Sequence, residues 1–211
     1  MSDSASAGRS PGRAADSRPP LILASTSRYR RELLERLRLP FEVMAPGVDE
    51  AARAGEKPAD LAERLSREKA RAVARRHAGA VVIGSDQVCE IGGEAIGKPG
   101  THERAVQQLR RLSGQRAVFH TSVCVVRLEV GYERHEAAPV VVRFRALTDD
   151  EIEHYLRTEQ PYDCAGSAKC ETLGITLLDA IESDDPTALV GLPLIRTARL
   201  LREAGIDPLR P

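Results

Sequence analysis

Asp86 is the residue of this sequence whose type and position point first to chemistry. It follows the apolar run of residues 80–83 and the dipeptide Gly84-Ser85. A short apolar run that ends in Gly and Ser predicts a strand buried on both faces. A carboxylate just past the end of such a strand lies where open α/β sheets bind their ligands. An aspartate after Gly-Ser also shapes ordinary turns, and for Asp86 taken alone that explanation is the more common one.

A second group of polar residues joins a predicted strand to a predicted helix that begins at Ser27. Ser25, Thr26 and Ser27 offer hydroxyl groups beside the backbone N–H groups of a helix N-terminus, which together favour an anion. Three arginines follow directly, and guanidinium groups suit phosphate oxygens: Arg28, Arg30 and Arg31. An ordinary serine N-cap before a solvated basic turn is the alternative. Three cations at a helix N-terminus oppose the helix dipole, however, so we expect an anionic ligand here.

Further charged residues could serve the same ligand. Asp49 and Glu50 follow a second predicted strand, and with Asp86 they could bind Mg²⁺, which prefers a few carboxylates plus substrate phosphates. A solvated acidic loop is the alternative. Lys69 interrupts the apolar face of a long predicted helix, where it either extends to the edge of the core or reaches a phosphate. Lys98 stands between glycine and proline in a rigid loop and has the same two explanations.

The elements that must position these residues alternate along the chain. Strands are predicted at residues 21–24, 41–44, 80–83, 118–128, 140–144 and 175–181. Helices are predicted at residues 27–38, 58–77, 101–112, 148–157 and 193–204. A hairpin is expected at Gly92-Gly93, and the strands on either side of Gly131 are expected to pair antiparallel. The sheet is therefore mixed, which predicts an α/β fold without pure Rossmann topology.

Composition excludes several classes of protein. The chain has 211 residues, 31 Lys plus Arg and 31 Asp plus Glu, so its formal net charge is +0 and no nucleic-acid-binding surface is expected. The 4 cysteines form no CxxC pair, which argues against a zinc site, and reduced thiols in a cytoplasmic protein are expected. No run reaches transmembrane length.

The first 19 residues differ in composition from the rest. Residues 1–19 are rich in Ser, Ala, Gly, Arg and Pro and have almost no large apolar side chain. They lack the apolar segment of a signal peptide and cannot bury enough surface to fold. We therefore predict a flexible tail over residues 1–19 and one domain over residues 20–211.

Taken together, the motifs resemble the Maf family (septum formation inhibitor Maf) of nucleoside triphosphate pyrophosphatases over residues 21–208. The motifs that carry the resemblance are Ser25-Thr26-Ser27, Arg30-Arg31-Glu32-Leu33-Leu34, Val48-Asp49-Glu50, Lys69, Gly84-Ser85-Asp86-Gln87, Gly97-Lys98-Pro99, Leu112-Ser113-Gly114, Cys164-Ala165-Gly166-Ser167 and Val190-Gly191-Leu192-Pro193-Leu194. The resemblance implies a mixed, elongated and curved sheet with flanking helices, and two lobes around a cleft. It also implies a homodimer.

The resemblance implies an activity and a site as well. The enzyme would hydrolyse a nucleoside triphosphate between the α and β phosphates, with Asp86 as the proton acceptor that activates water. Glu50 and Asp86 would place a divalent cation, Mg²⁺ or Mn²⁺. The triphosphate would be held by Ser25, Ser27, Arg30, Lys69 and Lys98. This agrees with the chemistry of phosphoryl transfer, which needs positioning and charge neutralisation more than covalent catalysis.

Within the family, Gln87 and Glu171 resemble the 7-methyl-GTP branch rather than the dTTP and UTP branch. The Glu171 carboxylate can accept hydrogen bonds from guanine N1–H and the exocyclic amine. A 7-methylated purine is cationic, so the aromatic face of Tyr29 attracts it. That branch usually has Trp beside Pro where this chain has Arg28-Tyr29. Two alternatives stay open: a non-catalytic nucleotide-binding regulator of septum formation, and a house-cleaning pyrophosphatase for other modified purine nucleotides.

Overall fold

A mixed sheet runs through the part of the chain that the computed structural model describes, residues 18–210. The strands of this sheet are β1 (Leu21–Leu23), β2 (Glu42–Val43), β3 (Val81–Ile91), β4 (Glu94–Ile96), β5 (Arg116–Arg127), β6 (Tyr132–Phe144) and β7 (Leu178–Glu182). Their order is β2-β1-β3-β5-β6-β7, and β4 pairs with β3. β1 is parallel to β2 and β3, whereas the other pairs are antiparallel. The predicted mixed α/β fold is confirmed.

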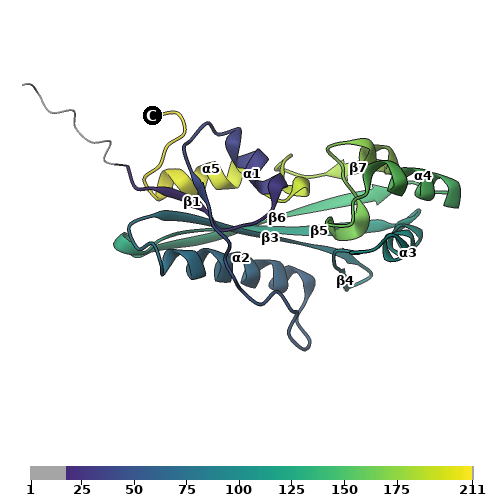
Figure 1. The fold of residues 1–211 in the computed structure, drawn as a ribbon, viewed down its shortest axis with the longest axis horizontal. Helices are drawn as coiled ribbons and strands as arrows, with labels where there is room; N and C mark the ends of the chain where they lie inside the picture. Colours follow the sequence, from purple (N-terminus) through teal and green to yellow (C-terminus); the bar gives the residue numbers. More distant parts are fainter. Residues whose placement is uncertain (1–17, 211) are drawn as a thin grey trace, which may run out of the picture.

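The helices cover the sheet unevenly (Figure 1). They are α1 (Arg28–Glu35), α2 (Pro58–Ala74), α3 (His102–Leu112), α4 (Asp149–Glu159) and α5 (Leu194–Glu203). α1 and α5 lie on one face of the sheet at the end that carries β1, and α2 lies on the opposite face. α3 and α4 lie at the far end, near β7. All of the predicted helices are therefore present, each with slightly different ends.

The core divides along the length of the sheet in the same way. Leu23, Leu34 and Leu201 are buried between the sheet and the pair α1 and α5. On the opposite face Val73 and Val82 pack between the sheet and α2. At the far end a third cluster joins α3 and α4 to the sheet, with Phe119, Leu109 and Leu156 among its buried members.

β3 is longer than predicted, which corrects the placement of Asp86. The expected strand ended at residue 83, but β3 extends to Ile91 and Asp86 lies inside it. The physical reason is the partner: β5 pairs with β3 up to Glu90, and Ser122 lies opposite Asp86. The parallel pairing nevertheless ends where it was expected to end, because β1 stops at Leu23 opposite Ile83. Asp86 thus lies past the end of its parallel neighbour but within an antiparallel ladder.

Two other strand predictions were wrong in extent. β6 begins at Tyr132 rather than at residue 140. The first half of β6 is polar and does not predict a strand, but hydrogen bonds to β5 hold it in the sheet. The strand expected over residues 175–181 begins only at Leu178, after a 3-10 helix at Leu173–Leu177. There a Cβ on Gly174 would lie 2.4 Å from the carbonyl oxygen of Lys169, so the chain folds back tightly instead of extending.

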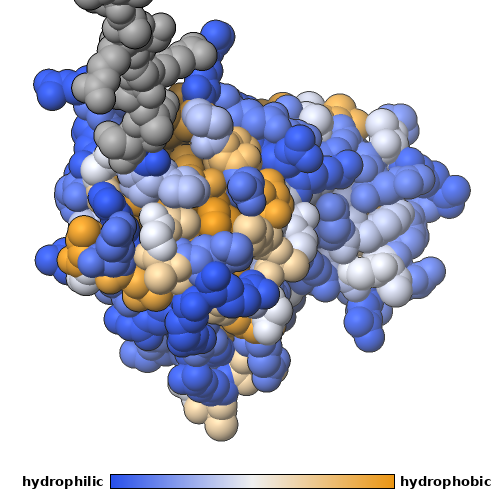
Figure 2. All heavy atoms as spheres, turned by 60° about the vertical axis from the view of Figure 1, so that its left-hand side comes forward, coloured by the Kyte–Doolittle hydropathy of each residue, from blue (hydrophilic) through white to orange (hydrophobic). Residues whose placement is uncertain are grey.

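The end of the molecule at β1 and β2 carries apolar surface. Figure 2 shows apolar side chains gathered among hydrophilic ones at this end. A hollow of about 320 Å³ there is lined by residues that include Leu39, Phe41 and Ile206. The predicted tail over residues 1–19 lies outside the described residues except for Arg18 and Pro19. Among the described residues, no helix combines the length and the apolar character that crossing a membrane requires.

Candidate active site

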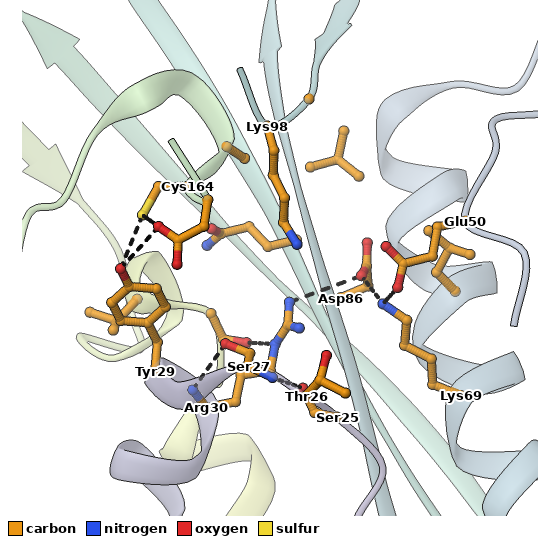
Figure 3. Close-up of a pocket in the computed structure, with 18 of the residues that line it drawn as sticks. Ser25, Thr26, Ser27, Tyr29, Arg30, Glu50, Lys69, Asp86, Lys98 and Cys164 are labelled. Carbon is orange, nitrogen blue, oxygen red and sulfur yellow. Dashed lines mark hydrogen bonds and ion pairs between the residues drawn. The ribbon is translucent and has the colours of Figure 1, made fainter. Parts of the chain in front are cut away.

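A cavity of about 790 Å³ opens beside β3 between α1, α2 and the loop that follows α4. The site residues that the resemblance implies all line it: Ser25, Ser27, Tyr29, Arg30, Glu50, Lys69, Asp86, Gln87, Lys98 and Glu171. Figure 3 shows most of them pointing toward a common space. Residues that lie far apart in the sequence are therefore brought together as the resemblance implied. Asp49 and Arg31, which the sequence also suggested for the metal and the anion, do not line it: Asp49 Oδ1 accepts the N–H of Ala51, and Arg31 pairs with Glu35 on the surface of α1.

The alternation of side chains along β3 determines what each residue of the Gly-Ser-Asp-Gln motif faces. Successive residues of a strand point to opposite faces of the sheet. Asp86 therefore faces α2, while Ser85 and Gln87 face the segment of residues 188–191. Gly84 makes the approach of α2 close enough, because a Cβ there would lie 2.2 Å from the carbonyl oxygen of Ser66. This contact brings Lys69 of α2 within reach of Asp86.

Lys69 joins two carboxylates at the centre of the cavity. Its Nζ donates to Asp86 Oδ1 at 2.6 Å and lies 2.6 Å from Glu50 Oε1. The Lys69 side chain is only 4% exposed, and Asp86 is also buried. Arg30 adds a second positive group, with its Nη2 at 4.0 Å from Asp86 Oδ1. Buried charges need such partners, and here each charge is compensated by a neighbour of opposite sign.

Glu50 stays anionic in this setting. Burial by itself raises the pKa of Glu50, but the hydrogen bond and the charge of Lys69 act in the opposite direction and, with Lys98 and Arg30, leave the pKa below its ordinary value. The Glu50 carboxylate is therefore ionised at neutral pH and free to exchange one cation for another.

The donor set fits a divalent cation that takes most of its ligands from substrate and water. Glu50 and Asp86 converge on one point, which the ammonium of Lys69 shares. Within residues 18–210 there is no group of three or more His, Cys, Asp or Glu side chains placed to hold a metal. Mg²⁺ is commonly bound by one or two carboxylates together with phosphate oxygens, so the pair is sufficient for that kind of site.

The start of α1 orients the hydroxyls and the guanidinium. Ser27 is the N-cap and its Oγ accepts the N–H of Arg30 at 3.4 Å, while Ser25 Oγ accepts the N–H of Ser27 at 3.1 Å. The N-cap explanation for Ser27 is thus correct, and it holds together with a place in the cavity. Arg30 Nε donates to the carbonyl of Gly191 at 2.9 Å, which fixes the direction of its guanidinium.

The side-chain amide nitrogen of Gln87 lies within hydrogen-bond distance of three acceptors of the protein. Nε2 lies 2.9 Å from Thr121 Oγ1, 2.9 Å from the carbonyl of Ala188 and 3.0 Å from that of Leu189. An amide nitrogen has only two hydrogens to donate, so these acceptors take both. The donor side of the Gln87 amide is therefore committed to the protein, and only its oxygen can serve a ligand.

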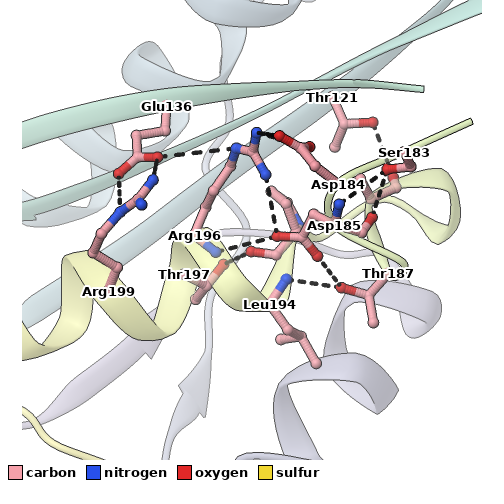
Figure 4. Close-up of polar contacts among 12 residues, drawn as sticks. Thr121, Glu136, Ser183, Asp184, Asp185, Thr187, Leu194, Arg196, Thr197 and Arg199 are labelled. Carbon is pink, nitrogen blue, oxygen red and sulfur yellow. Dashed lines mark hydrogen bonds and ion pairs between the residues drawn. The ribbon is translucent and has the colours of Figure 1, made fainter. Parts of the chain in front are cut away.

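The carbonyls that hold Arg30 and Gln87 belong to a segment that Asp185 anchors (Figure 4). Asp185 is fully buried, and its Oδ2 accepts the N–H of Arg196 in the first turn of α5 at 3.1 Å. Its Oδ1 lies 3.1 Å from Thr187 Oγ1, which in turn accepts the N–H of Leu194 at 2.8 Å. Pro193 is the N-cap of α5 and makes no side-chain cap, so Asp185 takes over that function from a distance.

Sequence reasoning missed Asp185 and Ser85, because both act on the backbone rather than on a ligand. Ser85 Oγ has one hydrogen to donate and lies 2.8 Å from the carbonyl of Ser122 and 2.9 Å from that of Gly191, which also accepts the bond from Arg30. The available signal was the run Ser183-Asp184-Asp185 just before the Gly191 motif, since Asp and Ser often bond to nearby backbone.

The other end of the cavity is more exposed. Tyr29 OH donates to Asp163 Oδ1 at 3.3 Å, and Cys164 Sγ lies 3.6 Å from the same hydroxyl. Burial is the main cause that raises the pKa of Tyr29, and burial also raises the pKa of Cys164 to about 12. Both groups are therefore protonated at neutral pH. Asp163 and Cys164 were not among the predicted site residues, and Glu171 lies on the same side of the cavity.

Comparison with known proteins gives one consistent result. The family model described as "Maf-like protein" matches residues 20–204. A protein of Polaromonas sp. (strain JS666) named 7-methyl-GTP pyrophosphatase is 64% identical over 89% of this chain and 85% of its own length. Proteins of the same name from Albidiferax ferrireducens and Bordetella pertussis are 62% and 60% identical, each over 90% of this chain and 95% of their own length. The resemblance seen in the motifs is confirmed: this chain belongs to the Maf family.

Proposed function

We propose that this protein hydrolyses 7-methyl-GTP to 7-methyl-GMP and pyrophosphate, and that it is thus a hydrolase acting on an acid anhydride. The observation that carries the proposal is the contact of the buried Lys69 ammonium with Asp86 and Glu50, in a cavity that Arg30 and Lys98 also line. The relatives named 7-methyl-GTP pyrophosphatase share more than half of their residues with this chain, which supports the same substrate.

The triphosphate is held by hydroxyls and cations on two sides. Ser25, Ser27 and Arg30 come from the start of α1, and Lys98 comes from the loop after β4. Arg30 is the most firmly oriented of them, since the carbonyl of Gly191 takes its Nε and leaves the outer nitrogens for phosphate oxygens. Phosphoryl transfer depends mainly on such positioning and charge neutralisation.

Asp86 is the proton acceptor. Its Oδ1 accepts a hydrogen bond from Lys69, which fixes the orientation of the carboxylate, so that the remaining lone pairs can take a proton from water. The oxygen of that water forms the new P–O bond, the α–β anhydride bond breaks, and pyrophosphate leaves with the electron pair. The released proton stays on Asp86 until solvent removes it.

Glu50 and Asp86 hold a divalent cation, Mg²⁺ or Mn²⁺, together with the substrate phosphates. When bound, that cation neutralises the charge that develops on the phosphate oxygens. Lys69 shares the same carboxylates, so it keeps their charges compensated in the absence of the cation.

The base is read by Glu171 and Gln87. Glu171 can accept the N1–H and the exocyclic amine of guanine. Gln87 offers only its amide oxygen, since the nitrogen bonds to the protein, and so it also selects a donor on the substrate. Tyr29 supplies an aromatic face, which attracts the positive charge of a 7-methylated purine.

A nucleotide panel tests the proposal. The purified protein is given 7-methyl-GTP, GTP, ITP, dTTP or UTP with Mg²⁺, and pyrophosphate release is measured, with an excess of EDTA as the metal control. We expect the highest kcat/KM for 7-methyl-GTP and loss of activity with EDTA that Mg²⁺ or Mn²⁺ restores. A preference for ITP would favour the pyrophosphatase for other modified purines, and binding without turnover would favour the regulator.

Two finer features belong to this proposal. We place the enzyme in the cytoplasm, where its nucleotide substrate occurs, and we expect no nucleic-acid polymer or membrane as a partner. A homodimer stays a prediction from the family, and light scattering after size-exclusion chromatography measures it directly.

A further inference from the structure

Arg28 lies on the aromatic ring that was predicted to receive the base. Its guanidinium carbon is 4.7 Å from the centroid of the Tyr29 ring. Its Nη2 donates to Tyr29 OH at 2.7 Å and lies 4.0 Å from Asp163 Oδ2. The Arg28 side chain thus already occupies a place formed by the Tyr29 ring and the Asp163 carboxylate.

We propose that Tyr29 and Asp163 form a subsite for a planar cation, that Asp163 selects the positive charge of a 7-methylated purine, and that Arg28 occupies this subsite until the substrate displaces it. Asp163 is thereby a specificity-determining residue. The inference rests on the proposed function, because 7-methyl-GTP is the substrate whose base carries a positive charge.

The chemical likeness between the two occupants supports this assignment. A guanidinium group is planar, delocalised and cationic, and it stacks on aromatic rings while it donates hydrogen bonds. A 7-methylguanine ring has the same features, whereas the ring of unmodified guanine is neutral. A place that holds Arg28 through the Tyr29 ring and the Asp163 carboxylate therefore favours the methylated base over guanine.

The hydroxyl of Tyr29 organises the subsite. It donates to Asp163 Oδ1 at 3.3 Å and accepts from Arg28, so it turns the carboxylate toward the ring. Because burial raises the pKa of Tyr29, this donor is protonated at neutral pH. Asp163 thus keeps a defined place although its side chain is 55% exposed.

Charge is distributed along the cavity in a matching way. Its inner end carries Arg30, Lys69 and Lys98, which suit an anionic triphosphate. Its outer end carries the carboxylates of Asp163 and Glu171, which suit a cation. 7-Methyl-GTP has charges of both signs in that order, whereas GTP has only the negative ones. Arg30, Lys69 and Lys98 outnumber the carboxylates of Glu50 and Asp86 at the inner end, and displacement of Arg28 leaves the outer end anionic. Each end then complements one of the two charges of the methylated nucleotide.

The competition between Arg28 and the base makes the inference testable. The measured quantity is the ratio of kcat/KM for 7-methyl-GTP to that for GTP, in wild type, Asp163→Asn and Arg28→Ala. We expect Asp163→Asn to lower the ratio by up to about fivefold, the size of an exposed ion pair. We expect Arg28→Ala to raise it, through a lower KM for 7-methyl-GTP, because the internal occupant is gone.

Arg31→Ala is the matched control. Arg31 lies on the same helix, carries the same charge and pairs with Glu35, but it does not line the cavity. Its removal changes the net charge as Arg28→Ala does, so we expect it to leave the ratio unchanged. Titration calorimetry with 7-methyl-GMP and GMP supplies a second readout that does not depend on turnover, and the same order of variants is expected there.

The possible failures are distinguishable. If wild type does not hydrolyse 7-methyl-GTP, the proposed function fails. If wild type hydrolyses it but Asp163→Asn and Arg28→Ala change both substrates equally, the planar-cation subsite is wrong and the proposed function stands. A ratio that shifts to the same extent in Arg31→Ala also overturns the inference, since general charge would then be the cause.

Discussion

The two ends of the cavity are built in different ways. At the inner end Lys69 and Asp86 lie on α2 and β3, bond to each other at 2.6 Å and are almost inaccessible to solvent. At the outer end Asp163 and Glu171 lie in the loop after α4, and the side chains of Arg28 and Asp163 are 63% and 55% exposed. Packed elements thus hold the buried Lys69–Asp86 pair, whereas a loop holds the exposed carboxylates of Asp163 and Glu171 that meet the base.

This difference between the two ends predicts where a substitution reduces the stability of the protein most. Removal of one partner from a buried charge pair leaves an uncompensated charge, which is strongly destabilising. Exposed pairs contribute little to stability, so their substitution costs little. Substitutions at the outer end are therefore expected to cost little stability, whereas those that break the buried pair at the inner end are expected to cost more.

The largest effect is expected at the inner end. Asp86→Asn is nearly isosteric and leaves Glu50 as a partner of Lys69, so the fold should persist with a lower melting temperature, but the amide cannot accept the proton from water. We expect turnover to fall by about 10²–10⁴-fold, the range for loss of a general base. Steady-state pyrophosphate release measures the turnover, and the melting temperature measures the stability of the fold. Near-native turnover at saturating Mg²⁺ would show that Asp86 is not the proton acceptor.

A second large effect is expected where one residue supports both ends. Asp185 anchors the segment whose carbonyls orient Arg30 and Gln87. Asp185→Asn leaves buried donors poorly paired, so we expect a stability loss of about 1–3 kcal/mol in urea unfolding. We also expect KM to rise for every nucleotide, because the phosphate contacts of Arg30 are shared by all substrates.

Asp184→Asn is the control for that prediction. Asp184 also pairs with Arg196, at 3.0 Å, but its side chain is exposed. We expect it to change stability and KM little. Equal effects of the two substitutions would mean that the charge of Arg196, rather than the anchoring of the segment, is what matters.

At the outer end a selective effect is expected. Glu171→Gln keeps the size of the side chain but turns one acceptor into a donor that faces guanine N–H groups. We expect a loss of about 1–3 kcal/mol in transition-state stabilisation for guanine substrates, from badly paired groups, and little loss for UTP. A ratio of kcat/KM for 7-methyl-GTP over UTP equal to that of wild type would mean that the base is read elsewhere.

A smaller effect concerns pH at the boundary between the ends. Because the pKa of Glu50 is lower in the folded protein than its ordinary value of 4.5, its ion pair with Lys69 adds stability above that value and loses it as the pH falls further. We expect wild type to melt at a higher temperature than Glu50→Gln at pH 7, and the difference to shrink below about pH 4.5. A difference that grows on acidification would have the wrong sign.

The smallest effect is expected outside both ends. Removal of residues 1–17 should leave the melting temperature and the turnover almost unchanged, since termini of this composition contribute few contacts. A clear drop in either quantity would show that the N-terminal segment contacts the domain.

The sequence by itself determined the family, the helices and the identity of the groups in the cavity. Capping residues and apolar spacing indicated each helix, and at the start of α4 Thr148 and Glu151 form a capping box. Such signals depend only on residues close together in the sequence, so they can be recognised without knowledge of the fold. The charged residues were recognisable because cations at a helix N-terminus and a lysine on an apolar face are unfavourable without a ligand.

Only the tertiary structure decided the rest. The length of β3 and β6 depends on pairing with β5, a partner distant in sequence, and so Asp86 lies inside a strand rather than beyond one. The orientation of the Gln87 amide depends on carbonyls of another segment. The contact of Arg28 with Asp163 joins residues that no local pattern relates. Hydrogen bonds and charge contacts between residues far apart in the sequence determine these features, and only folding brings the two partners of each contact together.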